Sequence, residues 1–128
     1  ELVADSEKFN QMLLDMRLAD FVRSQTLQND VCFFDRGTPD VLAYMTCFDQ
    51  PIKQSFVDLC KAHMYDFIFL LPPWELIFTQ DTERFETFSQ AKEIYMQLKE
   101  TYSNLGYQVI EVPIGTVEKR VEFILKSL

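Results

Sequence analysis

A chain of 128 residues, 48% hydrophobic and 25% charged, is large enough for one globular domain, residues 1–128, with a single core. Its 20 acidic and 12 basic residues give a net charge of -8, which argues against a nucleic-acid backbone or an anionic membrane as a general partner. No apolar run is long enough to span a membrane and the first residues do not resemble a signal peptide, so a cytoplasmic location is expected.

The first predicted element is a helix over residues 6–28. Apolar residues recur there at helical spacing, so we expect their face to pack on a core while the charged residues stay solvated. The expected inward residues are Phe9, Met12, Leu13, Met16, Ala19 and Val22.

The next stretch predicts a short apolar strand over residues 31–34 that ends in Asp35, Arg36 and Gly37. Ligands of open α/β sheets bind outside the carboxyl ends of the strands, where phosphate and metal chemistry is usually done. Asp35 and Arg36 are therefore candidate site residues. The alternative is an ion pair that only closes the turn into the following helix.

A second helix is predicted over residues 38–48, with Thr38 as its N-cap and Pro39 at the first helical position. Asp40 is a candidate substrate-binding residue, or a carboxylate that only favours the positive end of this helix. The expected inward residues are Val41, Leu42, Met45 and Phe48.

The middle of the chain predicts a helix over 51–63 and then a strand over 67–71 that is apolar at every position. Such a strand is typical of a sheet covered on both faces. A double proline ends it, and Trp74 follows either as an aromatic wall of a pocket or as a seal on the end of the sheet. The expected inward residues of the helix are Ile52, Phe56, Leu59 and Cys60.

In the last third, a capping box over 87–90 begins a helix that Gly106 ends. A strand over 107–112 follows, and Thr116 caps a final helix whose core side holds Val117, Val121, Ile124, Leu125 and Leu128. Strands separated by helices require parallel crossovers, which predicts an α/β fold with a three-layer α/β/α sandwich.

The three cysteines, Cys32, Cys47 and Cys60, lack the spacing of a metal site. They are expected to be buried, reduced side chains that act as small hydrophobes.

Four segments together resemble a known family: residues 33–44 (FFDRGTPDVLAY), 69–75 (FLLPPWE), 81–84 (DTER) and 106–113 (GYQVIEVP). They are similar to the AAA-type P-loop ATPase family related to the ribosylnicotinamide kinase domain of the bacterial regulator NadR. The resemblance implies a P-loop, kinase-like fold that binds ATP or GTP with Mg²⁺ and transfers the γ-phosphoryl group to a small-molecule acceptor.

The resemblance also implies roles for particular residues. Asp35 would accept the proton of the attacking hydroxyl or order the water shell of the magnesium ion, and Arg36 would contact phosphate or substrate. Glu83 and Arg84 fall in a lid-like passage, where Arg84 would neutralise charge that develops during transfer. The alternative for Glu83 and Arg84 is a solvated surface pair.

One part of the family pattern is missing. The phosphate-cradling loop GxxxxGK[ST] is absent, because none of the glycines Gly37, Gly106 and Gly115 is followed by Lys-Ser or Lys-Thr. We therefore expect a truncated domain without its central P-loop strand, which would lie between 31–34 and 67–71. Direct pairing of these two strands, a strand from another chain or an omitted native segment would close the gap.

The leading hypothesis is a P-loop NTPase or small-molecule kinase of which this chain supplies the acceptor and lid half, inactive alone. One alternative is a non-enzymatic, nucleotide-dependent switch or scaffold. Another is a truncated relative that keeps the fold for oligomerisation, including homo-oligomers, and binds no nucleotide.

Overall fold

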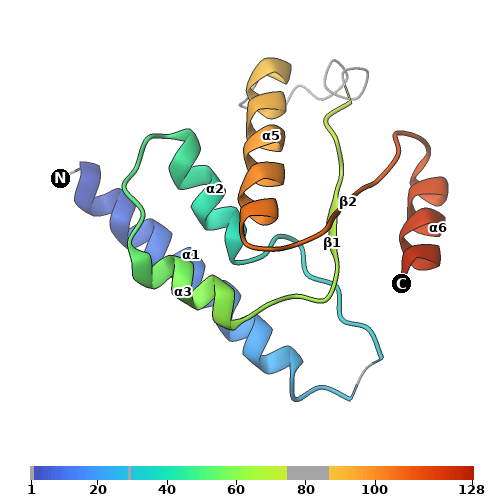
Figure 1. Ribbon diagram of the computed structural model, residues 1–128, viewed down its shortest axis with the longest axis horizontal. Coiled ribbons are helices and arrows are strands. Elements are labelled where there is room, and N and C mark those ends of the chain that lie inside the picture. The colour runs from blue at the N-terminus through green and yellow to red at the C-terminus, as the bar shows by residue number, and fades with distance from the viewer. Residues whose placement is uncertain (1, 29, 75–86) are drawn as a thin grey trace. The chain divides into compact units, whose positions relative to one another are not determined.

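The computed structural model describes residues 2–28, 30–74 and 87–128 (Figure 1). The chain divides into two compact units, Glu1–Met64 and Tyr65–Leu128. The first unit contains the helices α1 (Leu2–Ser24), α2 (Pro39–Cys47) and α3 (Gln54–Ala62). The second contains β1 (Ile68–Leu70), α5 (Phe88–Asn104), β2 (Val109–Glu111) and α6 (Val117–Ser127).

The core of the first unit is built around α2, which packs on both α1 and α3. Leu14 of α1 is fully buried, and Phe56 and Cys60 are the buried residues of α3. Of the residues predicted to face inward on α2, Val41, Leu42 and Met45 are buried but Phe48 is 65% exposed.

The predicted inward face of α1 is wrong. Phe9, Met12, Met16 and Val22 are between 48% and 58% exposed, whereas Leu14 is completely buried. Leu14, Leu18 and Phe21 share a different face of the helix, since they are spaced four and three residues apart. The helix is apolar on two sides, so periodicity alone does not decide which side packs.

The strand predicted over residues 31–34 is also wrong, because these residues have no regular secondary structure. A strand needs a neighbour for its backbone hydrogen bonds, and the sheet found in the described part of the chain pairs only β1 with β2. Phe34 instead packs on Phe21, with 6.5 Å between the ring centroids. Cys32 in this segment is exposed, contrary to expectation, while Cys47 is partly buried and Cys60 is buried, and none of the three forms a disulfide in the described part of the chain.

In the second unit β1 and β2 run side by side and parallel, with Ile68 opposite Val109 and Leu70 opposite Glu111 (Figure 1). The buried Val112 extends the pairing by donating its N–H to the Leu70 carbonyl at 2.8 Å. The intervening helix α5 contacts β2, so the predicted parallel crossover is confirmed for this pair. The strand predicted over 67–71, which contains β1, was expected to be covered on both faces. This expectation is not met, because Ile68 and Leu70 are buried while Phe67 and Leu71 are about half exposed.

Both ends of α5 follow the sequence prediction. Thr87 and Gln90 form a reciprocal capping box, with bonds of 3.1 Å and 2.8 Å between side chain and backbone. At the other end Gly106 has a φ of 100°, and its N–H donates to Ser103 while Tyr107 donates to Tyr102. This pattern is a Schellman motif, which requires the left-handed conformation that glycine adopts most easily.

The last helix, α6, begins as predicted, because the Thr116 hydroxyl accepts the Lys119 N–H at 3.2 Å. Its predicted core side is not buried, since Val117, Val121, Leu125 and Leu128 are each more than 40% exposed. None of the helices in the described ranges is long and apolar enough to cross a membrane. The described residues thus form helices and a two-stranded parallel sheet, which agrees with the predicted α/β class.

Candidate functional site

The segment Asp35-Arg36-Gly37 forms a sharp corner at the start of α2. Arg36 has a φ of 71°, in the left-handed region that residues other than glycine adopt at a cost of about 1 kcal/mol or more. Strained backbone of this kind persists where the surrounding structure holds it and often coincides with functional sites. The backbone strain therefore falls on Arg36, one of the two candidate site residues predicted at this corner.

Asp40 holds this corner in place. Its side chain is 8% exposed, and the carboxylate accepts the Gly37 N–H at 3.1 Å and lies 3.5 Å from the Arg36 guanidinium. Thr38 does occupy the N-cap position, but its hydroxyl makes no capping bond and instead interacts with the thiol of Cys60. The capping bond predicted for Thr38 is thus not formed, and the Asp40 carboxylate instead ties the chain before α2 to its first turn, near the positive end of the helix.

Arg36 is fixed by Tyr44 as well as by Asp40. Its Nη1 donates to the Tyr44 hydroxyl at 3.1 Å, and the guanidinium lies 5.6 Å from the centre of the Tyr44 ring. Burial works to lower the pKa of Arg36, but Tyr44, Asp40 and Asp35 outweigh it and leave that pKa raised. The side chain is therefore a positioned, permanently charged hydrogen-bond donor.

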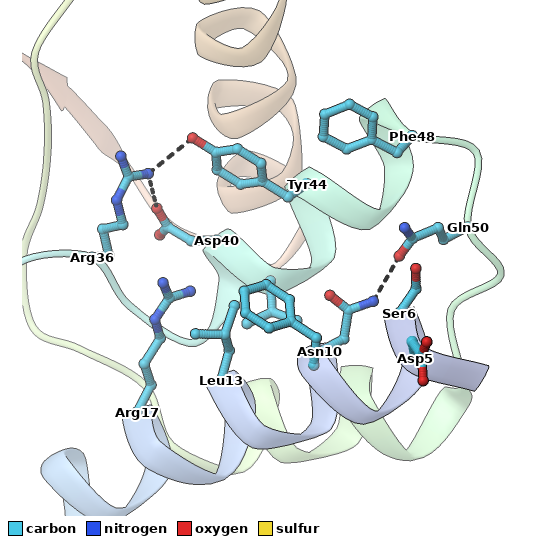
Figure 2. Close-up of a pocket in the computed structure, with 12 residues that line it drawn as sticks. Asp5, Ser6, Asn10, Leu13, Arg17, Arg36, Asp40, Tyr44, Phe48 and Gln50 are labelled. Carbon is cyan, nitrogen blue, oxygen red and sulfur yellow. Dashed lines mark hydrogen bonds and ion pairs between the residues drawn. The ribbon is translucent and has the colours of Figure 1, made fainter. Parts of the chain in front are cut away.

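A pocket of about 470 Å³ opens between α1 and α2 next to this corner (Figure 2). Arg36, Asp40 and Tyr44 line one end, and Arg17 extends from α1 to the same end, where its Nη1 lies 3.4 Å from the Gly37 carbonyl. Asn10 donates to the Gln50 side chain at 2.6 Å toward the other end. The remaining lining residues are Asp5, Ser6, Phe9, Leu13, Val41 and Phe48.

Gln50 reaches the pocket because of how α2 ends. Asp49 has a φ of 55°, and the Gln50 N–H donates to the Met45 carbonyl at 2.8 Å, which turns the chain back toward α1. The predicted end of this helix at residue 48 is confirmed to within one residue. This turn places the Gln50 amide beside Asn10, forty residues earlier in the chain.

The structure brings together only part of the predicted site. Arg36 and Asp40 are in contact and line the pocket, whereas Asp35 is exposed and does not line it. Trp74 is partly buried after β1 in the second unit. Glu83 and Arg84 lie outside the described residues.

Sequence reasoning missed Arg17, which it assigned to a solvated face of the first helix. The missed signal was its spacing: Arg17 follows the buried Leu14 by three residues and therefore lies on the packed side. Tyr44 and the Asn10–Gln50 pair were missed too, because a single tyrosine or amide side chain has no distinctive sequence pattern until its neighbours are known.

The described residues provide few ligands for a metal ion or for nucleotide phosphates. No group of three or more His, Cys, Asp or Glu side chains within 2–28, 30–74 and 87–128 is arranged to hold a metal. Mg²⁺ commonly uses one or two carboxylates together with substrate phosphates, so Asp35 alone would suit it only beside a bound nucleotide. Since the 128-residue sequence has no GxxxxGK[ST] loop, these residues do not build a phosphate cradle.

Comparison with known proteins identifies the family. Residues 1–120 match the family model described as AAA domain. The chain belongs to this family. No curated protein and no solved structure matches the chain. Membership in the AAA family suggests a nucleotide-binding P-loop domain.

Proposed function

We propose that this chain is the acceptor side of a P-loop nucleotide-binding domain with kinase-like, three-layer α/β/α architecture, related to the ribosylnicotinamide kinase domain of NadR. The observation that carries the proposal is the AAA family match over residues 1–120. The strained Arg36 and the buried Asp40 that fixes it support a functional corner rather than an ordinary turn.

Asp35 and Arg36 have different parts in this proposal. Asp35 is exposed, and in the described part of the chain it forms no close ion pair, so its carboxylate is accessible to an incoming hydroxyl whose proton it would accept. Arg36 is held by Asp40 and Tyr44 with about half of its side chain exposed, and its remaining N–H groups would contact a phosphoryl or acceptor oxygen.

ATP or GTP and its Mg²⁺ would be held by a P-loop that is not among these 128 residues, because their glycines do not build one. When bound, the nucleotide supplies the phosphoryl group. The part assigned to this chain is to orient the acceptor and to present a carboxylate and a guanidinium beside it. The roles that the resemblance implies for Trp74 and Glu83 in substrate binding, and for Arg84 in the lid, remain part of the proposal.

The test is nucleotide turnover by the intact protein with and without an acceptor. We expect ATP hydrolysis or transfer to rise when ribosylnicotinamide or another nucleoside is added, and Asp35→Asn to reduce this acceptor-dependent rate by about 100-fold. Asp30→Asn is the matched control, because Asp30 is an exposed aspartate five residues earlier and should leave the rate unchanged.

Acceptor-dependent turnover that survives Asp35→Asn would rule out the role assigned to this carboxylate. Turnover that no nucleoside stimulates would argue for a nucleotide-dependent switch instead of a kinase.

A further inference from the structure

We infer that the pocket between α1 and α2 binds a small organic acid, one with a flat apolar body and a single carboxylate, and that Arg17 is the residue that binds the carboxylate. All of the groups involved lie within residues 5–50, in the first unit. The pocket shares Arg36 and Asp40 with the acceptor side proposed above, but the inference requires neither a bound nucleotide nor phosphoryl transfer, so its test can fail or succeed separately.

Arg17 is the first reason. It lines the pocket and is partly buried, yet its contact with the Gly37 carbonyl is long, at 3.4 Å. No carboxylate of the described residues lies within ion-pair distance of it. A guanidinium has five N–H donors in a fixed fork, and one bond from Arg17 to a protein acceptor is seen among the described residues, so further donors are available to a ligand.

The balance of charge is the second reason, and it favours one negative charge on the ligand. Arg36 is already neutralised by the buried carboxylate of Asp40. Asp5, the other acid of the pocket, is twelve residues from Arg17 on α1, which is about 18 Å along the helix axis. Among the described residues at its end of the pocket, Arg17 is thus the charged side chain without an ion-pair partner, and a monovalent carboxylate matches it better than a phosphate dianion close to Asp40.

The walls of the pocket are the third reason. Leu13 and Val41 form its apolar sides, and the rings of Phe9 and Phe48 are 55% and 65% exposed. Aromatic side chains bury large apolar areas and stack on flat ligands, so a planar body would cover rings that now face water. A volume of about 470 Å³ is within the usual range of small-molecule sites.

The far end of the pocket is closed by its own hydrogen bond. The Asn10 amide donates to the Gln50 side-chain oxygen at 2.6 Å, so these two groups satisfy one another in part. A ligand would not need a polar group at this end. The recognition is therefore carried by one anion at the Arg17 end and by apolar contact along the remainder.

The experiment uses two probes of nearly the same shape, 2-naphthoate and its neutral amide 2-naphthamide, titrated in nucleotide-free buffer and followed by calorimetry and NMR. We expect the wild-type protein to bind the acid about tenfold more tightly than the amide, because a charge-assisted hydrogen bond is worth more than a neutral one. The NMR shifts should fall on α1 and α2. Arg17→Gln should remove the preference while leaving amide binding unchanged.

Arg23→Gln is the control on the same helix. Arg23 pairs with Asp20 at 2.9 Å on an exposed surface away from the pocket lining, so its loss should not change the preference. Arg17→Lys keeps the charge but not the fork, and should retain a reduced preference. If Arg17→Gln fails to fold, the wild-type preference must still shrink as NaCl is raised, since the contact is ionic.

Several results would overturn the inference: equal affinity of wild-type protein for the acid and the amide, no binding of either probe, or a preference that survives Arg17→Gln. NMR shifts confined to the exposed apolar residues of α6 would show adventitious binding to an apolar surface. Tighter binding of 2-naphthyl phosphate than of 2-naphthoate would overturn the choice of a singly charged ligand.

Discussion

Of the three described residues in the left-handed backbone region, Arg36, Asp49 and Gly106, the first and the last make the clearest contrast. After α5 the residue is Gly106, with a φ of 100°, whereas before α2 it is Arg36, with a φ of 71°. Glycine adopts this conformation at little cost, and arginine does not. The difference indicates that Gly106 is present because the backbone conformation favours glycine, whereas Arg36 is present for its side chain, in spite of the backbone conformation.

The ion pairs beside the two corners differ in how deeply their side chains are buried. At the Arg36 corner the carboxylate partner, Asp40, is buried and also holds a backbone N–H. Near the Gly106 turn, Lys99 of α5 pairs with Glu111 of β2, and both side chains are more than 40% exposed. The comparison predicts that the Asp40 corner is costly to disturb and the Lys99 pair is not.

The largest effect is expected for Asp40→Ala, which leaves the Gly37 N–H and the Arg36 guanidinium without their carboxylate. We expect a loss of about 3 kcal/mol in the free energy of unfolding in urea. Asp40→Asn keeps an acceptor for Gly37 and should cost about 1 kcal/mol. A loss from Asp40→Ala as small as that of the exposed Glu118→Ala would contradict the structural role of Asp40.

A smaller effect is expected for Gly106→Ala. A Cβ at this position would meet no atom within 4 Å, so the cost is conformational only, at about 1 kcal/mol. Gly115→Ala is the comparison, because its added Cβ would make ordinary contact with Lys119 at 4.0 Å and its φ is not positive. Equal stability of the two variants in thermal unfolding would mean that the turn after α5 does not depend on glycine.

For Arg36→Gly we expect a net loss of about 1 kcal/mol in the free energy of unfolding, because the relief of strain offsets only part of the cost of leaving the buried Asp40 carboxylate without its cation. Acceptor-dependent turnover should nevertheless fall. Asp49→Gly relieves a similar strain without removing a pocket side chain, so it should raise stability by up to about 1 kcal/mol and leave turnover unchanged. Full turnover in Arg36→Gly would mean that the Arg36 side chain has no role in the reaction.

The smallest effect is expected for Lys99→Met. The hydrogen bond from Lys99, together with Tyr95, lowers the pKa of Glu111. The stabilising contribution of Glu111 is therefore present above its unfolded pKa and is lost as the pH falls through the folded value. In Lys99→Met the pKa of Glu111, followed by NMR of its side-chain carboxyl, should rise toward the ordinary range. An unchanged pKa would remove Lys99 as its main cause.

Local signals in the sequence predicted local structure well. The capping box at Thr87, the stop at Gly106 and the cap at Thr116 were all found where expected, because each depends on residues within one turn of the helix end. The parallel pairing of β1 and β2 followed from the helix between them.

Features that depend on distant partners were not predicted. The strand over 31–34 had an apolar pattern but no neighbour in the described part of the chain, and pattern alone does not supply backbone hydrogen bonds. The packed side of α1 was misassigned because both sides are apolar, and this error also hid Arg17. The sequence motif predicted the Asp35–Arg36 corner of the site. The pocket beside this corner could be recognised only from the folded structure.

The burial of Cys60 gives the first unit a chemical reporter of its own folding. Cys60 is 0% exposed beside Thr38, and burial raises the pKa of its thiol even though the Thr38 hydroxyl acts to lower it. Alkylating reagents attack the thiolate, so Cys60 should be protected in the folded protein while the exposed Cys32 reacts at once. In a Cys32→Ser, Cys47→Ser background, the rate of Cys60 alkylation would then count how often the packing of α2 on α3 opens, without any added label.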